Sequence, residues 1–157
     1  MDGIEIVRIF VSPGHNFYGH DKDGPPSEHA AEEVESVECV AGRGLIGDRF
    51  FDYQPDYKGQ VTFFAAEVFE ALCEKFGVEG ASPGVLRRNV ITRGVDLNEW
   101  IGMKFEVQGV GFEGTEEARP CLWMNGAFAP GAREAMRGRG GVRARVLTDG
   151  ELRVGTF

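Results

Sequence analysis

Cys121 is the residue whose type and neighbours point most clearly to chemistry. It follows Arg119 and Pro120, so a rigid residue precedes it and a cation lies two positions away. A nearby cation favours the thiolate, which can act as a nucleophile, as a ligand to a soft metal or as a persulfide carrier. A cysteine that only packs in an apolar interior is the alternative, so the residue alone leaves both interpretations open.

The run Arg87-Arg88-Asn89 is a candidate anion site. Arginine offers a planar fork to phosphate or carboxylate, and asparagine adds a neutral donor and acceptor. Because adjacent residues of a strand point to opposite faces, we expect at most one of the two arginines to face a pocket. A surface ion pair is the alternative.

A glycine-rich segment, residues 41–49, carries Arg43, Asp48 and Arg49 and could cradle an anion with its backbone N–H groups. It matches neither a P-loop nor a dinucleotide fingerprint. Four more arginines lie in residues 137–145, where they could line an anion site or form a solvated face.

Three histidines lie in a polar N-terminal stretch. His15 and His20 could act in proton transfer, while His29, beside a glutamate, is a weaker candidate. Histidines on a solvated loop without a chemical role are the alternative.

Short strands are predicted to position these groups. The predicted strands are residues 4–11, 34–40, 60–64, 89–92, 142–148 and 151–155. Residues 104–114 predict a hairpin or one long kinked strand. Residues 65–76 predict a helix that ends at Gly77, residues 82–88 begin as a helix, and Pro130 can open another that ends at 138–141. Asp149-Gly150 predicts a hairpin between the last two strands.

The composition predicts one mostly β, α+β domain built as an antiparallel barrel or sandwich. The chain has 157 residues, of which 42% are hydrophobic and 23 are glycine. Its net charge of −8 argues against binding to nucleic acid, and no apolar run is long enough for a membrane span. Three scattered cysteines without a CxxC pair exclude a disulfide framework and a structural zinc site. Residues 1–10 lack the pattern of a signal peptide, so we expect a cytoplasmic protein.

Several stretches, taken in order, resemble the MOSC domain, which is named after the C-terminal domain of the molybdenum cofactor sulfurases. They read GLIGDRFF, QVTFFAAEVFEAL, SPGVLRRNVITRGVDLNEWIGMKFEV, GFEGTEEARPC and GRGGVRARVLTDGELRVG, within residues 37–155. The resemblance implies a strand-rich, barrel-like α+β domain over residues 1–157. It also implies an association with the molybdenum cofactor (molybdopterin), a pterin dithiolene with a terminal phosphate.

The resemblance also assigns roles to residues. Cys121 takes the position that ligates molybdenum or carries sulfur in the family. The cofactor pocket would receive its other contacts from Arg87, Arg88, Asn89, Thr92, Asp48 and Arg49, with Arg119 as the cation beside the cysteine. The family associates pyridoxal phosphate with a separate domain of the sulfurases, and amidoxime-reducing members have an extra N-terminal domain. We expect neither domain in this chain.

Three functions follow from this resemblance. The first is oxo transfer, or reduction of N-hydroxylated small molecules, in which His15 or His20 supplies protons. Because the chain shows no flavin or Fe–S motif, that molybdenum-dependent oxidoreductase needs an electron-donor protein. The second is a sulfur carrier that receives a persulfide on Cys121 from a sulfur donor and passes it to a cofactor or metal centre. The third is a non-catalytic pterin- or anion-binding module.

Overall fold

The computed structural model of the chain describes residues 4–13 and 31–156. The strands are β1 Glu5–Val11, β2 Glu32–Val34, β3 Ser36–Val40, β4 Gly44–Leu45, β5 Val61–Ala65, β6 Val90–Arg93, β7 Lys104–Val107, β8 Val110–Glu117, β9 Val142–Val146, β10 Gly150–Arg153 and β11 Gly155–Thr156. The α-helices are α1 Ala66–Phe76, α2 Trp123–Ala127 and α3 Ala132–Ala135, and two 3₁₀ helices are η2 Pro83–Leu86 and η3 Leu97–Trp100.

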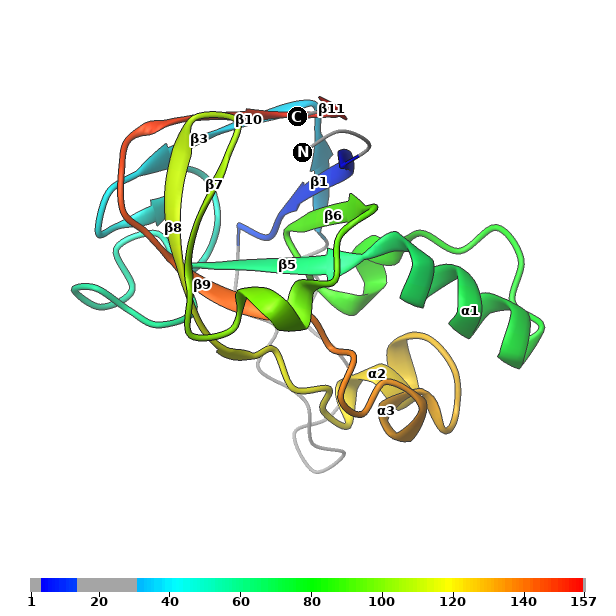
Figure 1. Cartoon of the computed structure of the whole chain (residues 1–157). Helices are drawn as coiled ribbons and strands as arrows, with labels where there is room; N and C mark the ends of the chain where they lie inside the picture. Colours follow the sequence, from blue (N-terminus) through cyan, green and yellow to red (C-terminus); the bar gives the residue numbers. More distant parts are fainter. Residues whose placement is uncertain (1–3, 14–30, 157) are drawn as a thin grey trace.

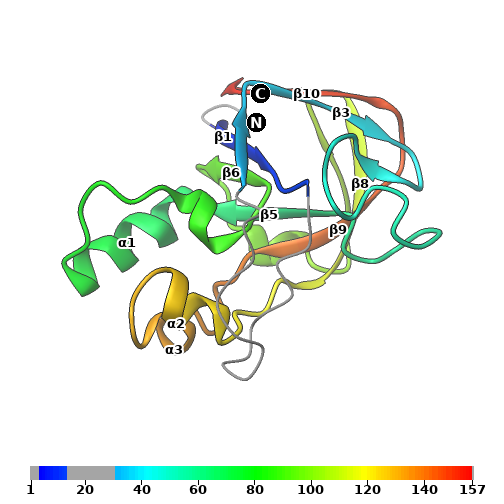
Figure 2. The same cartoon turned by 180° about the vertical axis from the view of Figure 1, so that it is seen from behind.

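The strands form two sheets. The larger has the order β11-β1-β6-β5-β9-β8-β7, with β2 paired to β1, and the smaller has the order β10-β3-β4. Neighbouring strands are antiparallel except β5 and β6, which are parallel. The helices gather at one end, away from β3 and β10 (Figures 1 and 2). The predicted mostly β, α+β class is confirmed, but both sheets are open, so the expected barrel is only a loose description.

Strand β5 separates two apolar clusters because its side chains alternate between faces. Phe63 is fully buried in the cluster between the sheets, where its ring meets Trp100 and Phe112 edge to face. Phe64 points the other way, into the cluster that contains Leu72 of α1. The two clusters fix β5 between the sheet core and the helical end.

Several predicted elements agree with the structure. The helix over residues 65–76 is α1, and Gly77 ends it with a left-handed φ of 63° and an N–H that bonds to Cys73 and Glu74 carbonyls. The segment 104–114 is a hairpin of β7 and β8, and both turn residues, Gln108 and Gly109, have positive φ. Among the described residues, no helix is long and apolar enough to cross a membrane.

The predicted hairpin at Asp149-Gly150 is wrong. Strand β9 pairs with β5 and β8, whereas β10 pairs with β3 in the other sheet. The Asp149 carboxylate accepts a hydrogen bond from the Ala41 N–H at 2.8 Å, which holds the chain as it crosses between the sheets. A Cβ on Gly150 would lie 2.6 Å from Val110, so this crossing needs glycine for close packing and not for a hairpin turn.

The helix predicted to open at Pro130 is the short helix α3, and a second short helix, α2, precedes it. Helix α2 starts soon after Cys121, and α3 follows Pro130 with Gly131 as its N-cap at a φ of 91°. The sequence missed α2 because five residues are too few for a visible apolar period.

Candidate functional site

An arginine-lined pocket, called here the arginine pocket, is the candidate functional site. It has a volume of about 360 Å³ and lies where the loop before β5, the start of β6, the end of β8 and β9 meet. Its lining consists of Arg49, Phe50, Lys58, Thr62, Arg87, Arg88, Glu116, Glu117, Ala118, Arg119 and Arg143. Six cationic side chains against two carboxylates, in a chain of net charge −8, make this pocket suited to a small anion.

Arg49 is the most informative residue of the pocket. Its side chain is only 9% exposed, its guanidinium lies 4.6 Å from the Phe50 ring centre, and Nη1 stays 4.0 Å from the Asp48 carboxylate. Nε and Nη1 have no hydrogen-bond partner among the described residues. Burial lowers the pKa of Arg49, with Asp48 opposing the shift and Arg143 adding to it. Buried donors without partners are uncommon, so they are available to an anion in the pocket.

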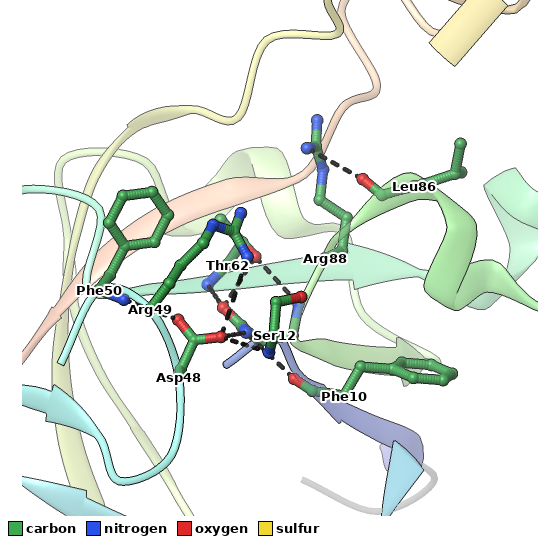
Figure 3. Close-up of polar contacts among 9 residues, drawn as sticks. Phe10, Ser12, Asp48, Arg49, Phe50, Thr62, Leu86 and Arg88 are labelled. Carbon is green, nitrogen blue, oxygen red and sulfur yellow. Dashed lines mark hydrogen bonds and ion pairs between the residues drawn. The ribbon is translucent and has the colours of Figure 1, made fainter. Parts of the chain in front are cut away.

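Asp48 holds the loop that carries Arg49 (Figure 3). Its buried carboxylate accepts hydrogen bonds from the Ser12 N–H at 2.8 Å, from Asn89 Nδ2 at 3.2 Å and from the Phe50 N–H at 3.2 Å. These contacts occupy the carboxylate with protein donors. Asp48 therefore positions Arg49, and its side chain does not line the arginine pocket.

Asn89 ties three segments together in the same way. Its Oδ1 accepts from the Thr62 N–H at 2.9 Å and from Thr62 Oγ1 at 3.1 Å. Its Nδ2 donates to the Phe10 carbonyl at 3.1 Å and to Asp48. Asn89 therefore joins β1, β5 and the Asp48 loop at the start of β6. Its Oδ1 and Nδ2 both form hydrogen bonds within the protein.

Arg88 clamps the backbone around the pocket. Its buried guanidinium donates to the carbonyls of Ala118 at 2.6 Å, Gly140 at 2.9 Å and Leu86 at 3.5 Å. Burial lowers the pKa of Arg88 to about 10, while the charge of Cys121 opposes that shift. The clamp fixes the segment between β8 and Cys121 against the loop before β9. Figure 3 shows the bond to Leu86.

Arg87 also lines the pocket, so the expectation that only one of the two arginines faces it is wrong. Arg87 is not in a strand: it ends η2 with a left-handed φ of 61°, and β6 starts at Val90. Strand alternation therefore does not apply to the pair. The Arg87 guanidinium lies 5.1 Å from the Trp123 ring centre. Burial and then repulsion from Arg49 lower the pKa of Arg87 to about 10.

Cys121 is exposed, between β8 and α2. Arg119, two residues before it, lines the arginine pocket, and Cys121 itself is not one of the lining residues. Cys39, in contrast, is buried, and burial raises its pKa to about 12. Exposure beside a cationic pocket fits a reactive cysteine better than one that serves core packing.

The other predicted site residues lie in different places. Arg119 is exposed and lines the arginine pocket. Thr92 is fully buried outside the pocket lining, and its Oγ1 has no hydrogen-bond partner within the described ranges. His15, His20 and His29 lie outside the described residues. The described part of the chain holds no cluster of three or more His, Cys, Asp or Glu side chains for a metal ion.

The pocket also contains residues that the sequence did not single out. Glu116 forms ion pairs with Lys58 at 2.9 Å and with Arg143 at 3.1 Å. The hydrogen bond from Lys58 is the main reason that the pKa of Glu116 is lowered. Arg143 belongs to the basic stretch 137–145, which was a usable signal, whereas nothing in the sequence marked Lys58.

The fold and the pocket together define a strand-rich α+β domain with a cationic site beside an exposed cysteine. The chain belongs to the MOSC domain family, whose model matches residues 41–156. A search of curated protein sequences finds no significant match.

Solved structures share this fold at low sequence identity. The protein YuaD of Bacillus subtilis aligns with a TM-score of 0.73 and 16% identity, over 97% of this chain and 92% of that one. The YiiM protein of Geobacillus stearothermophilus aligns with a TM-score of 0.70 and 16% identity, over 98% and 73% of the two chains. YiiM of Escherichia coli aligns with a TM-score of 0.63 and 14% identity, over 97% and 66%.

Proposed function

We propose that this protein binds the molybdenum cofactor in the arginine pocket, with Cys121 as a ligand to the metal. The observation that carries the proposal is Arg49, a buried guanidinium whose Nε and Nη1 lack partners among the described residues. Membership of the MOSC family, which is associated with this cofactor, supports the same conclusion.

The residues present fit the cofactor. A terminal phosphate needs forked cationic donors, and Arg49, Arg87 and Arg143 line one pocket. A pterin ring needs flat contacts, and the Phe50 ring lies in the same lining. Molybdenum takes soft thiolate ligands, and Cys121 is exposed two residues after Arg119, which lines the pocket.

The proposed reaction is oxo transfer or reduction of an N-hydroxylated small molecule. Reduction breaks the N–O bond, consumes two electrons and two protons, and releases water. When bound, the cofactor supplies the metal that exchanges the oxygen atom and the electrons. The chain itself would hold the anionic group with Arg49 and present Cys121 as the thiolate ligand. An electron-donor protein and protons from His15 or His20 complete the proposal.

Metal analysis of purified protein tests this function. The protein should come from cells that make the cofactor, and molybdenum and tungsten should be measured in wild type, Arg49→Gln, Cys121→Ser and Arg153→Gln. We expect near-stoichiometric molybdenum in wild type and in Arg153→Gln, an exposed control paired with Glu151. Arg49→Gln should lose metal, and Cys121→Ser should show one sulfur ligand fewer by X-ray absorption. Metal-free wild type from such cells would contradict the proposal.

A sulfur carrier is the second candidate, because an exposed cysteine two residues from a pocket arginine, Arg119, needs no metal to hold a persulfide. Intact mass before and after a reducing agent separates the two functions. A reducible adduct with the mass of one sulfur atom, confined to Cys121 in metal-free protein, would favour the carrier. If Cys121→Ser keeps both reductase activity and sulfur loading, both functions fail and a non-catalytic binding module remains.

A further inference from the structure

A smaller pocket, called here the side pocket, lies next to the arginine pocket on the Cys121 side. It has a volume of about 220 Å³ and is lined by Glu117, Arg119, Pro120, Arg133, Arg137 and Gly138. It shares Glu117 and Arg119 with the arginine pocket. Pro120 directly precedes Cys121, so the side pocket adjoins the cysteine through the chain.

The charge of the side pocket is suited to an anion. Three of its six lining residues are arginines and one is a glutamate. The Glu117 carboxylate is engaged by the Gly140 N–H at 3.3 Å. Arg119 and Arg133 form no ion pair with another described residue, although the chain carries an excess of acidic residues.

The remaining arginine is available at small cost. Arg137 pairs with Glu134 at 2.9 Å, but the two side chains are 74% and 70% exposed. Exposed pairs of this kind contribute roughly 0–1 kcal/mol, so a ligand can displace the pair. Gly138 has a φ of 77°, and nothing lies within 4 Å of the position of a Cβ there, which leaves the wall open beside Arg137.

We propose that the side pocket is a second anion site that takes a phosphate group on a small molecule. Three arginines from two segments, the turn before Cys121 and the region of α3, line one pocket of about 220 Å³, which has room for a phosphate group and part of the molecule that carries it. Resting on the proposed function, the inference also names a substrate class: small N-hydroxylated molecules that also carry a phosphate group.

Titration with inorganic phosphate, followed by ¹H–¹⁵N NMR, tests the second site without any metal. We expect saturable shifts at Arg133 and Gly138, which line only the side pocket, with a dissociation constant separate from that of the shifts at Arg49. The double variant Arg133→Gln/Arg137→Gln should weaken binding at the side pocket about 5-fold or more, the effect of about 1 kcal/mol. Binding at Arg49 should stay unchanged in that variant.

The control variants make the result specific. Arg49→Gln should remove the saturable shifts in the arginine pocket and keep those of the side pocket, and Arg153→Gln should change neither. Sodium chloride at matched ionic strength should give only linear shifts. The proposal is overturned if phosphate shifts around Arg133 are linear, or if the double variant binds as tightly as wild type. Because no step uses molybdenum, a failure of the proposed cofactor function leaves this test intact.

Discussion

Replacing Asn89 by alanine is expected to lower the free energy of unfolding by about 3 kcal/mol. The substitution removes four hydrogen bonds and leaves the half-buried Thr62 N–H and the buried Phe10 carbonyl without that partner. Each buried group left unsatisfied costs about 1–3 kcal/mol. For a chain of this size, about 2–4 °C per kcal/mol converts the loss into a fall in Tm of about 6–12 °C.

Urea unfolding measures this change, with Asn98→Ala as the matched control. Asn98 is exposed, and its amide donates one hydrogen bond, to the Gly138 carbonyl at 3.1 Å. Its removal should cost less than about 0.5 kcal/mol. Asn89→Ala should also weaken phosphate binding at Arg49, because Asp48 loses a donor that fixes its loop. Equal losses of stability in the two variants would show that Asn89 does not tie the segments together.

Three further predictions concern backbone packing and the cysteines. Gly140→Ala should lower the free energy of unfolding by more than about 2 kcal/mol in urea, because its Cβ would lie 2.1 Å from the carbonyl of Ala118. Gly126→Ala is the control, since its Cβ meets open space, and it should be neutral or stabilising. Iodoacetamide at pH 8 should label Cys121 and spare Cys39 until the protein unfolds, as read by peptide mass spectrometry; labelling of Cys39 in native protein would contradict its burial. Burial raises the pKa of Cys39 from 9.0 to about 12, so the thiol loses its proton at a lower pH in the unfolded chain than in the folded one. The free energy of unfolding should therefore fall as the pH rises from 9 to 12, and it should fall less steeply in Cys39→Ala.

Local patterns explain which elements could be predicted from the sequence. The alternation of residues 104–114 and the apolar face of 65–76 are set by neighbours in the chain, and both elements are present. The partner of β10 is not a local property, since its pairing with β3 joins segments more than 100 residues apart. The hairpin expected at Asp149-Gly150 failed for that reason.

The sequence predicted the residue types of the candidate site, but it did not predict which of them line the pocket and which hold the surrounding loops. Arg49, Arg87, Arg88 and Arg119 line the pocket, whereas Asp48 lies behind it. A polar side chain that binds a ligand and one that holds a loop use the same chemical groups, and only their partners distinguish them.

The arginine pocket itself should make the ligand-free protein less stable than it could be. Burial lowers the pKa of Arg49, Arg87 and Arg88, which means that the fold disfavours their charged forms. Arg49 has little to offset this cost, because its nearest carboxylate oxygen is 4.0 Å away and its Nε and Nη1 have no hydrogen-bond partner among the described residues.

Arg49→Met is therefore expected to leave the ligand-free protein as stable as wild type or more stable, because an apolar chain of similar length avoids the desolvation of a charge. The variant should also lose the stabilisation that a bound anion provides. In wild type, an anion present at 100 times its dissociation constant adds about 2.7 kcal/mol to the free energy of unfolding. Urea unfolding with and without phosphate separates the two effects. A variant that is strongly destabilised without phosphate would mean that Arg49 serves the fold, whereas a variant that loses only the phosphate effect would mean that this buried charge is kept for its ligand.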